Sequence, residues 1–496
     1  MSEDFDLTIR GGDVHTGKGA HRLDIGIRAE KIVALEPHLP PGRQDVKAAG
    51  RLILPGGIDS HCHIEQMSGM GRMGADDFTS GTISAAFGGT TTVIPFAMQR
   101  KGESLLSAIN DYADLASPKA VIDYAFHAIL TDPTTAVLDD EVPQAVAQGV
   151  NSFKIYMTYD AVKLDDYQIL DVLTTANRHN AFIMAHAESN DIVRWLTTRL
   201  LERGFTAPKY HEVAHDPLAE SEATYRAVSL ARLANAPLLL VHVGGMETVQ
   251  VLHSAQKMGA PIYAETCPQY LMLSRDNLDL PGMEGAKFCC APPPRDKASQ
   301  EAVWAGLANG TLKIFSSDHA PYRYDASGKL PKGDDTPFSE IANGIPGLET
   351  RLPLLFSEGV GKGRISLDRF VEVTATNPAK AYGLYPRKGA LQIGSDADIT
   401  VWDQERKVVI THDILHDRVG YTPYEGMEVT GWPETVISRG RIVVQENRLL
   451  AQPGSGVFLP CGPSEWRQNP ESPTPDGPGR SGRGLLFKKL FDWTSL

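Results

Sequence analysis

The stretch Gly56-Gly57-Ile58-Asp59-Ser60-His61-Cys62-His63 is the part of the sequence that decides the fold. It ends an apolar run that begins at Leu52, and this pattern predicts a strand that enters a loop. Side chains two residues apart on a strand share a face, so His61 and His63 are expected to point the same way. Two imidazoles at the carboxyl end of a strand form half of a transition-metal site. Since 15 histidines among 496 residues give roughly half an HxH pair by chance, the rest of the chain must support this hypothesis.

The composition is that of a soluble globular protein, with 42% hydrophobic and 22% charged residues. At 496 residues the chain is too long for one ordinary core, which predicts two domains and a tail. A net charge of −13 argues against nucleic acid and against an anionic membrane as partners. The sequence has no apolar run of the roughly 18 residues needed to cross a bilayer, and it starts with an acidic segment unlike a signal peptide.

The five cysteines are odd in number and irregularly spaced, which predicts reduced thiols and a cytoplasmic protein. Cys289 and Cys290 are adjacent and lack the CxxC spacing of a metal pair. Both are therefore expected to be buried thiols.

Both ends of the chain alternate polar and apolar residues, which predicts strands with one solvent-facing side. At the N-terminal end the pattern covers Leu7–Arg10, Ile25–Arg28 and Ile32–Leu35. It returns in Asp398–Trp402 and in Thr435–Val444. Two such ends around a different middle predict one small β-sandwich built from residues 1–52 and 386–452.

The middle of the chain, residues 53–385, alternates apolar strands with amphipathic segments of helical length, such as Asp166–His179 and Pro217–Ala234. The predicted strands are Leu52–Ile58, Thr91–Phe96, Val121–Leu130, Ser152–Met157, Phe182–Ala187, Leu238–Val243, Ile262–Thr266 and Ile314–Ser317. Several of these strands are too apolar to have a solvent-facing side. This is expected of parallel strands, which are buried on both faces. Eight such units predict an α/β fold with a TIM-type (β/α)8 barrel.

Polar residues that interrupt or close these strands fall at one end of the predicted barrel. In chain order they are His61 and His63 of the first strand, Lys154 of the fourth, His186 of the fifth, His242 of the sixth and Asp318 of the eighth. Chemistry in such barrels takes place at the carboxyl ends of the strands. Any one of these histidines could be a satisfied core histidine. Because a buried Lys or Asp without a partner is costly, six such residues at one end predict a shared site.

Several separated motifs give the chain a recognisable pattern: Pro55–Asp59, Gly88–Thr91, Ser152–Met157, Ala185–Glu188 and Tyr424–Met427. Together with the order HxH, Lys, His, His, Asp, they resemble the D-hydantoinase/dihydropyrimidinase family of the amidohydrolase superfamily. The resemblance covers about residues 5–450.

The resemblance implies two divalent metal ions, usually zinc, bridged by a lysine that CO2 has carboxylated. A lysine ammonium with a pKa near ~10.4 has no lone pair for a metal, whereas a carbamate has two oxygens. Carried over by motif, His61, His63, Lys154 and Asp318 would hold one ion, and Lys154, His186 and His242 the other. The resemblance further implies a bridging hydroxide as nucleophile and Asp318 as the proton shuttle.

Substrate contacts also follow from the resemblance. The hydroxyl of Tyr159, five residues past the lysine, would stabilise the developing oxyanion. Backbone groups of Ala291 and Asn343 would hold a cyclic imide or ureide. The family usually has Ser at the position of Ala291, so a hydroxyl contribution is absent here while a backbone contact remains.

Glu65 continues the face of His61 and His63, which predicts a carboxylate near the site. There it would repel an anionic substrate such as dihydroorotate, or it would orient a ligand histidine. The loop from Met67 to Met73 alternates Met with Gly, which predicts a flexible apolar lid, with plain loop packing as the alternative. His319 is expected to face away from Asp318, and His253, His412 and His416 are expected at the surface.

Residues 453–484 are rich in Pro, Gly, Ser and Arg, and a short amphipathic segment follows them. Residues 453–496 are therefore predicted to form an extended tail that contacts another subunit of a homodimer or homotetramer. The predicted function is ring opening of dihydropyrimidines and 5-monosubstituted hydantoins to N-carbamoyl amino acids. An allantoinase or a hydrolase of other cyclic imides is the alternative. A non-catalytic scaffold is disfavoured because all six ligand positions are filled.

Overall fold

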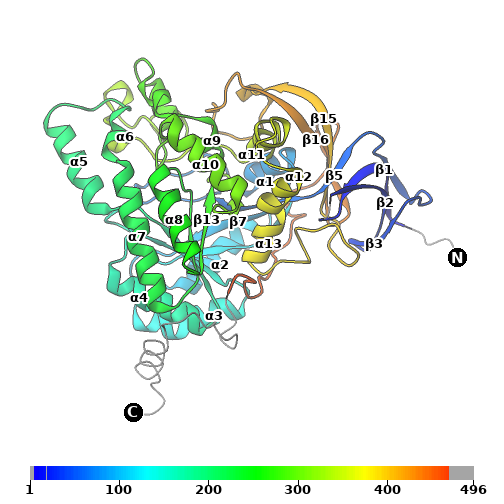
Figure 1. The fold of residues 1–496 in the computed structure, drawn as a ribbon, viewed down its shortest axis with the longest axis horizontal. Helices are drawn as coiled ribbons and strands as arrows, with labels where there is room; N and C mark the ends of the chain where they lie inside the picture. The colour runs from blue at the N-terminus through cyan, green and yellow to red at the C-terminus, as the bar shows by residue number, and fades with distance from the viewer. Residues whose placement is uncertain (1–4, 18, 468–496) are drawn as a thin grey trace, which may run out of the picture. The chain divides into compact units, whose positions relative to one another are not determined.

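Nine parallel strands form one curved sheet that closes into a barrel in the part of the chain that the structure describes. In this computed structural model, which describes residues 5–17 and 19–467, the strands follow the order β6-β7-β9-β10-β11-β12-β13-β14, and the short β8 also pairs with β7 (Figure 1). A parallel bridge joins Cys62 to His319, and the amide of Asp318 donates to the carbonyl of His61 at 2.8 Å. These contacts close the ring, and the predicted (β/α)8 barrel is confirmed.

The barrel strands are short and almost entirely buried, as parallel strands covered on both sides must be. They are β6 Gly57–Cys62, β7 Thr90–Met98, β8 Asp123–Tyr124, β9 His127–Ile129, β10 Ser152–Tyr156, β11 Phe182–His186, β12 Leu238–Leu240, β13 Ile262–Thr266 and β14 Ile314–Phe315.

Helices lie around these strands, with α4, α7 and α8 side by side on one flank (Figure 1). The helices are α1 Phe78–Phe87, α2 Leu105–Ala116, α3 Val142–Ala147, α4 Asp166–Arg178, α5 Asn190–Glu202, α6 Tyr210–Ala214, α7 Pro217–Ala234, α8 Met246–Lys257, α9 Pro268–Met272, α10 Lys297–Asn309, α11 Arg351–Leu355, α12 Leu367–Val371 and α13 Asn377–Ala381.

Local sequence explains where the two predicted helices, α4 and α7, begin and end. The side chain of Asp165 accepts from the amide of Gln168 in a capping box that starts α4. Asp216 caps α7, whose first residue is a proline, and Asn235 ends this helix in the left-handed conformation.

Two predicted strands differ from the structure. Leu52–Ile58 is two strands, because the chain leaves one sheet after β5 (Leu52–Pro55) and enters the barrel at β6. At the intervening Gly56, a Cβ would lie 2.1 Å from Oγ1 of Thr91, so only glycine fits this crossing. The predicted strand Val121–Leu130 is interrupted between β8 and β9.

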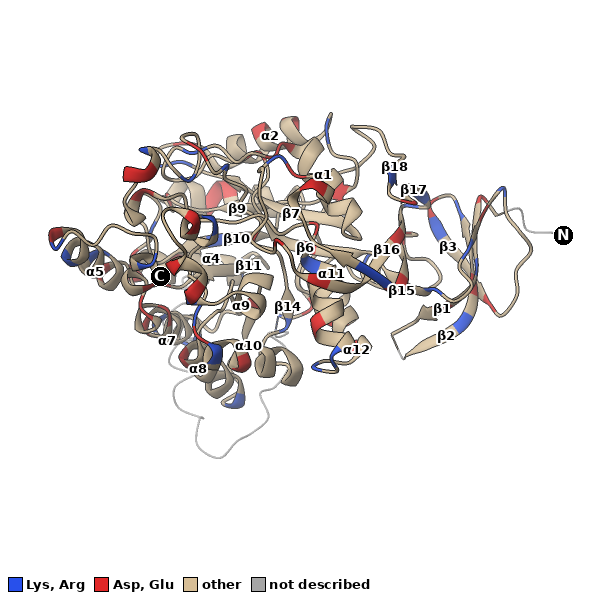
Figure 2. Cartoon of the chain, turned by 90° about the horizontal axis from the view of Figure 1, so that it is seen from above, with Lys and Arg blue, Asp and Glu red and all other residues tan. Residues whose placement is uncertain are grey.

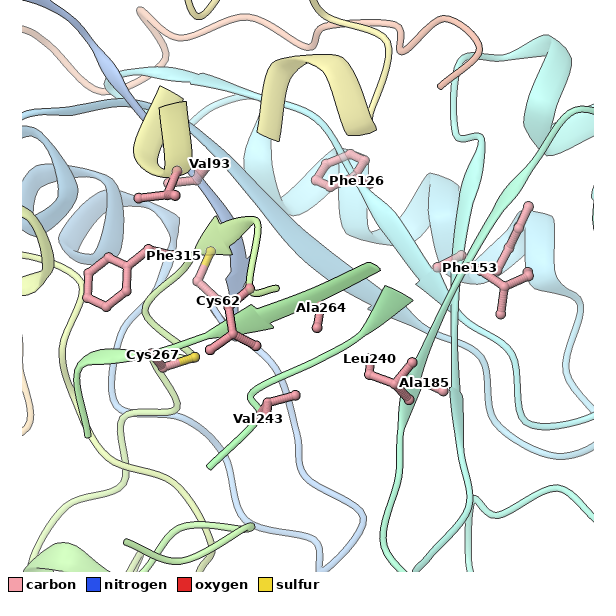
Figure 3. Close-up of a cluster of buried hydrophobic side chains, with 14 of the residues drawn as sticks. Cys62, Val93, Phe126, Phe153, Ala185, Leu240, Val243, Ala264, Cys267 and Phe315 are labelled. Carbon is pink, nitrogen blue, oxygen red and sulfur yellow. The ribbon is translucent and has the colours of Figure 1, made fainter. Parts of the chain in front are cut away.

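Alternate residues of the barrel strands face the surrounding helices and the barrel interior. Phe153 and Ala185 belong to the outer apolar cluster that strands and helices share (Figure 3). Phe182 and Met184 pack in a separate inner cluster. Because side chains alternate along a strand, Lys154 and His186 face the interior, where they meet.

A second, mostly antiparallel sheet is built from both ends of the chain, as predicted. Its order is β18-β17-β16-β15-β5-β1-β2-β3, with β4 paired to β1. The remaining bounds are β1 Leu7–His15, β2 Ala20–Arg28, β3 Lys31–Glu36, β4 Gln44–Lys47, β15 Ile399–Val409, β16 Glu428–Ser438, β17 Arg441–Gln445 and β18 Arg448–Leu449. Apolar residues from both ends share one core. The boundaries at 52 and 386 stay a prediction, since the chain up to Trp466 forms one compact unit.

Buried charges join this sheet to the barrel. The ammonium of Lys388 donates to Asp123 on β8 and to Asp398, each at 2.7 Å. The guanidinium of Arg439 donates to the other oxygen of Asp123 at 2.9 Å. Asp123 and Asp398 thus share two cations, Lys388 and Arg439, that come from outside the barrel. These ion pairs fix the sheet against the amino-terminal end of the barrel.

The first part of the predicted tail packs on the chain's own barrel, which corrects the prediction of an extended arm for these residues. The amides of Gly456, Leu459 and Cys461 donate to carbonyls of Ala120, Tyr124 and Gly149. Leu459 and Cys461 join the inner apolar cluster, and Trp466 stacks on Tyr263. Residues 468–496, where the subunit contact was predicted, lie outside the described residues.

The other bulk predictions concern thiols, charge and membranes. All five cysteines are buried and free, as predicted for Cys289 and Cys290. Acidic and basic residues are interspersed over the helices around the barrel (Figure 2). In the described residues, no helix combines the length and the apolar character that a membrane crossing requires.

Replacing Lys388 by Met removes a shared cation from Asp123 and Asp398, which stay buried. We expect the free energy of unfolding to fall by about 3–5 kcal/mol, as measured by urea unfolding followed by circular dichroism. Burial raises the pKa of Asp398, and Lys388 opposes this rise. The pKa therefore rises further in the variant, so the loss of stability should shrink as the pH falls and Asp398 takes up a proton.

Lys31→Met is the matched control. Lys31 pairs with Asp396 in the same cluster, but its side chain is 42% exposed. An exposed pair contributes at most about 1 kcal/mol. Equal losses in the two variants would contradict the structural role assigned to Lys388.

Candidate metal and substrate site

A cavity of about 310 Å³ opens at the carboxyl ends of the barrel strands. The predicted site residues that line it are His63, Lys154, Tyr159, His186, His242, Ala291, Asp318 and Asn343. His61 is fully buried and contacts Lys154 and Asp318. The structure therefore brings all of the sequence-predicted site residues together.

The HxH pair and Asp318 converge on one point. Nε2 of His61 lies 3.2 Å from Oδ1 of Asp318, and Nε2 of His63 lies 3.6 Å from the same oxygen. One nitrogen from each histidine and one carboxylate oxygen lie within 4.8 Å of one another, a spacing at which they could hold a metal ion. Burial alone would raise the pKa of Asp318, but His61, His63 and Lys154 lower it to about 2, so its carboxylate is ionised.

Lys154 occupies the centre of the site. Its Nζ lies 2.8 Å from Nε2 of His61, and 4.5 Å and 5.1 Å from the ring centroids of Phe96 and Tyr156. Burial lowers the pKa of Lys154 to about 8, against the attraction of Asp318 and Glu265. The amine thus loses its proton far more readily than an exposed lysine does.

His186 and His242 form the second histidine pair. Nε2 of His242 lies 2.9 Å from Nδ1 of His186, and Nδ1 of His242 is buried without a hydrogen-bond partner among the described residues. Burial lowers the pKa of both imidazoles, and also that of His61. Neutral imidazoles are the form that binds a metal.

Three of the four site histidines form a hydrogen bond through the ring nitrogen that faces away from the centre of the site. This hydrogen bond fixes the direction of the lone pair on the other ring nitrogen. Nδ1 of His61 is hydrogen bonded to Glu265, and Nδ1 of His63 donates to Gln66. Nε2 of His186 donates to Glu188 at 2.7 Å. Such outer partners direct the remaining lone pair of each ring toward the centre. The set of inward nitrogens and one carboxylate fits divalent transition metals such as zinc.

Glu188 connects the site to the end of α6. Its other oxygen accepts from Nδ1 of His215 at 2.8 Å. Burial would raise the pKa of Glu188, but His215 and His186 hold it well below its usual range. One turn earlier, Nε2 of His211 on α6 donates to the carbonyl of Cys290 at 2.8 Å, beside the predicted substrate contact Ala291.

Three functional residues adopt the left-handed backbone conformation that non-glycine residues avoid: Tyr159 at φ 70°, His242 at φ 42° and Asp318 at φ 50°. Each costs on the order of 1–3 kcal/mol and persists only when the surroundings hold it. On β12, Leu239 packs in the inner cluster and Leu240 in the outer one. His242 would face outward if this alternation continued, and its left-handed backbone instead turns the imidazole into the cavity.

Tyr159 and Asn343 meet on the wall of the cavity, where the amide of Asn343 is hydrogen bonded to the phenol. Burial and Glu188 raise the pKa of Tyr159 well above its usual value, so its hydroxyl keeps its proton. Ala291 lines the same cavity. All three residues thus lie on the cavity wall, and their contacts with a substrate stay a prediction.

A buried lysine that the sequence interpretation missed ties the two substrate segments together. Nζ of Lys329 donates to the carbonyl of Cys289 at 2.6 Å and to that of Ala342 at 2.8 Å. The amide of Gly344 donates to the same Cys289 carbonyl at 3.1 Å. Lys329 is fully buried, and burial lowers its pKa to about 8.

The prediction for Glu65 is wrong. Its backbone turns at φ 48°, and its carboxylate pairs with Lys119 and accepts from the amide of Phe78 at the start of α1. Glu65 therefore faces away from the cavity and neither repels a substrate nor orients a histidine. The latter role belongs to its neighbour Gln66.

The loop from Met67 to Met73 lies at the mouth of the cavity, as predicted for a lid. Met67 and Met70 line the cavity and are largely exposed. A bridge between Met67 and Met73 closes the loop at its base. Ser68 is hydrogen bonded to Tyr322, four residues after Asp318, so the loop rests on the strand end that carries Asp318.

The positions of His319 and His253 agree with their predictions, whereas that of His416 does not. Nε2 of His319 donates to Asp76 and its Nδ1 accepts from Gly347, so this ring faces away from the metal set. His253 is exposed. His416 is not a free surface residue, because it is hydrogen bonded to Glu349 and stacks on Phe87.

Sequence reasoning missed the residues behind the ligands. A signal existed for Glu188, which follows His186 by two residues, and for Glu265, an acidic residue near the end of the apolar seventh strand. No sequence pattern joined Lys329 to Cys289, since their contact depends on how two loops fold back over the barrel.

Comparisons with known proteins agree with this geometry. The family model described as "Amidohydrolase family" matches residues 52–443. A D-hydantoinase from Ralstonia pickettii is 39% identical over 456 residues, 92% of this chain and 98% of that protein. A D-phenylhydantoinase from Escherichia coli is 36% identical over 459 residues, 91% of this chain and 97% of that protein. The crystal structure of a dihydropyrimidinase from Brevibacillus agri is 40% identical, with a TM-score of 0.90, and covers 92% of this chain and 99% of that one.

A parallel barrel with four histidines, a lysine and an aspartate at its carboxyl end defines a metal-dependent hydrolase fold. The chain belongs to the amidohydrolase family. The resemblance to its D-hydantoinase/dihydropyrimidinase branch is confirmed.

Replacing Lys329 by Met removes the cross-link between the segments that carry Ala291 and Asn343, but it leaves every metal ligand in place. We expect kcat/KM to fall about 10- to 100-fold, since small displacements of positioning groups have effects of this size. Metal content should stay unchanged. Steady-state kinetics and elemental analysis measure the two quantities.

Lys332→Met is the control, since Lys332 lies three residues away and is exposed in a pair with Glu340. It should leave kcat/KM unchanged. If Lys329→Met behaved like this control, Lys329 would have no part in positioning the substrate segments.

Proposed function

We propose that this enzyme hydrolyses the ring amide of dihydropyrimidines and 5-monosubstituted hydantoins, which yields N-carbamoyl amino acids. The observation that carries the proposal is the meeting of four imidazoles, Lys154 and Asp318 at the mouth of one barrel, beside Tyr159 and Asn343. The named activities of the relatives support the substrate class.

The proposal includes two divalent metal ions, with zinc as the predicted element, and a carboxylated Lys154. The pKa of about 8 supports carboxylation, because the reaction with CO2 needs the neutral amine. At neutral pH a pKa near 8 gives roughly two hundred times more neutral amine than an ordinary lysine has. The amine nitrogen bonds to the carbon of CO2 and releases one proton, which leaves an anion with two oxygens. His61, His63 and Asp318 would hold one ion, His186 and His242 the other, and the carbamate would bridge them.

Bound ions of this kind lower the pKa of a water molecule and polarise a carbonyl oxygen. The chain supplies the other steps. The ionised carboxylate of Asp318 accepts the proton of the attacking water and passes it to the ring nitrogen as the carbon–nitrogen bond breaks. The Tyr159 hydroxyl, which keeps its own proton, donates to the carbonyl oxygen as negative charge develops there.

The substrate is expected to be neutral. Among the described residues that line the cavity, Lys154 is the only Lys or Arg, and it is taken up by the metal site. These residues thus leave no basic side chain to pair with a substrate carboxylate, which disfavours dihydroorotate even though Glu65 pairs with Lys119. Met67, Met70 and Met98 offer adaptable apolar contacts for a substituent on the ring.

Allantoin and other cyclic imides remain the second candidate, because they share the ring amide that Tyr159 and Asn343 would hold. A homodimer or homotetramer remains a prediction. It is supported by α5, which buries none of its residues and exposes Trp195, and by α7, which exposes Tyr225.

Lys154→Ala and Asp318→Asn test the site from opposite sides. Elemental analysis of dialysed wild-type enzyme should return two metal equivalents per chain. Lys154→Ala should lose metal and activity together, and short carboxylic acids should restore part of both by filling the gap. Asp318→Asn should retain metal while kcat falls about 10²- to 10⁴-fold, since the proton transfer fails. Normal turnover by Lys154→Ala would end the two-metal scheme.

A side-by-side comparison of kcat/KM on dihydrouracil, hydantoin, phenylhydantoin, allantoin, dihydroorotate and a plain cyclic imide tests the substrate class. We expect dihydrouracil or a hydantoin to give the highest value, with phenylhydantoin accepted because the Met67–Met73 loop is apolar and adaptable. The highest value on allantoin or dihydroorotate would contradict this assignment while leaving the amidohydrolase chemistry intact.

A further inference from the structure

The three anchored ligand histidines do not have equivalent partners. His61 faces the carboxyl group of Glu265 and His186 faces the carboxylate of Glu188, whereas His63 faces the side-chain amide of Gln66. A carboxylate behind an imidazole increases the basicity of the ligand nitrogen, and a neutral amide does so much less. Among these three histidines, His63 is thus the one whose partner has no ionisable group.

The orientation of the Gln66 amide follows from its second contact. Its Nε2 donates to the carbonyl of Phe96 at 3.2 Å, and a carbonyl can only accept a hydrogen bond. The amide oxygen therefore faces His63, whose Nδ1 must carry a proton. The lone pair of His63 is then on Nε2, on the side of Asp318.

The backbone of Gln66 fixes this arrangement in place. The carbonyl of Gln66 accepts from the amide of Gly74 at 3.0 Å, at the neck of the loop that carries Met67 and Met70. The side chain is almost completely buried, at 9% exposed. Gln66 is thus held at three points, and its side chain has no room to exchange partners.

We propose that Gln66 is a positioning residue that sets the tautomer of His63 and, because it is neutral, leaves the metal ion beside His61 and His63 less tightly held than a carboxylate at this position would. The inference rests on the proposed metal site. It assigns the strength of one metal–ligand bond to an uncharged side chain behind the ligand. An anionic residue at this position would make the site bind this ion more tightly, and an apolar residue would make it bind the ion less tightly.

Zinc release to an excess of a chromogenic chelator tests the proposal on full-length, zinc-loaded enzyme without any substrate. Wild type should release zinc in two phases, one from each ion. Gln66→Met should accelerate one phase about 10- to 100-fold, and Gln66→Glu should slow the same phase by a similar factor. The other phase, from the side of His186, should not change. Structural damage cannot explain a variant that releases zinc more slowly than wild type.

Met67→Leu is the matched control, since Met67 lines the same cavity from the same loop and is a neighbour of Gln66 in the sequence. It should release zinc as wild type does. Release rates of Gln66→Glu and Gln66→Met that equal wild type would overturn this inference alone. A wild-type enzyme that holds no zinc would overturn the proposed function, and this inference with it.

Discussion

The burial of the Lys154 amino group is the constraint on which the rest of the site depends. It lies against two aromatic rings and an imidazole nitrogen, and the described residues give it no ion pair within 4.0 Å. An ammonium in such surroundings is costly. Proton loss relieves part of the cost, and the proposed carboxylation of Lys154 between two metal ions would relieve more. The inward imidazole lone pairs and the ionised Asp318 follow the same logic, since all of them require positive charge at the centre.

The fold supplies this arrangement through the closure of the barrel. The amide of Asp318 donates to the carbonyl of His61 where the last strand meets the first, so two ligands far apart in sequence become neighbours. The site has two further structural requirements at the carboxyl end of the barrel. His242 and Asp318 must adopt left-handed backbone conformations, and the loops that carry Ala291 and Asn343 must be held together by Lys329. Strained backbone and a buried charge are thus both needed at the end of the barrel that carries the candidate site.

The sequence predicted the barrel and the ligand set because both leave short-range patterns. Lys154 interrupts an apolar strand, and His186 closes one. The outer partners of the ligands were harder to find. Glu65 looked equivalent to His61 and His63 by the period of a strand, but the strand ends at Cys62 and the chain turns at Glu65. The carboxylate then pairs with Lys119, and Gln66 takes the place behind His63. The packing of residues 453–466 on the barrel was also hidden, because it depends on backbone hydrogen bonds that composition does not reveal.

Carbon-13 magnetic resonance of the metal-loaded enzyme, prepared in labelled bicarbonate, tests the role of Lys154 most directly. The account predicts one carbamate resonance per chain, which is absent from Lys154→Ala and disappears when acid or chelation removes the metal. An active, metal-loaded enzyme without any carbamate resonance would contradict it, since the buried lysine would then have to act as an amine.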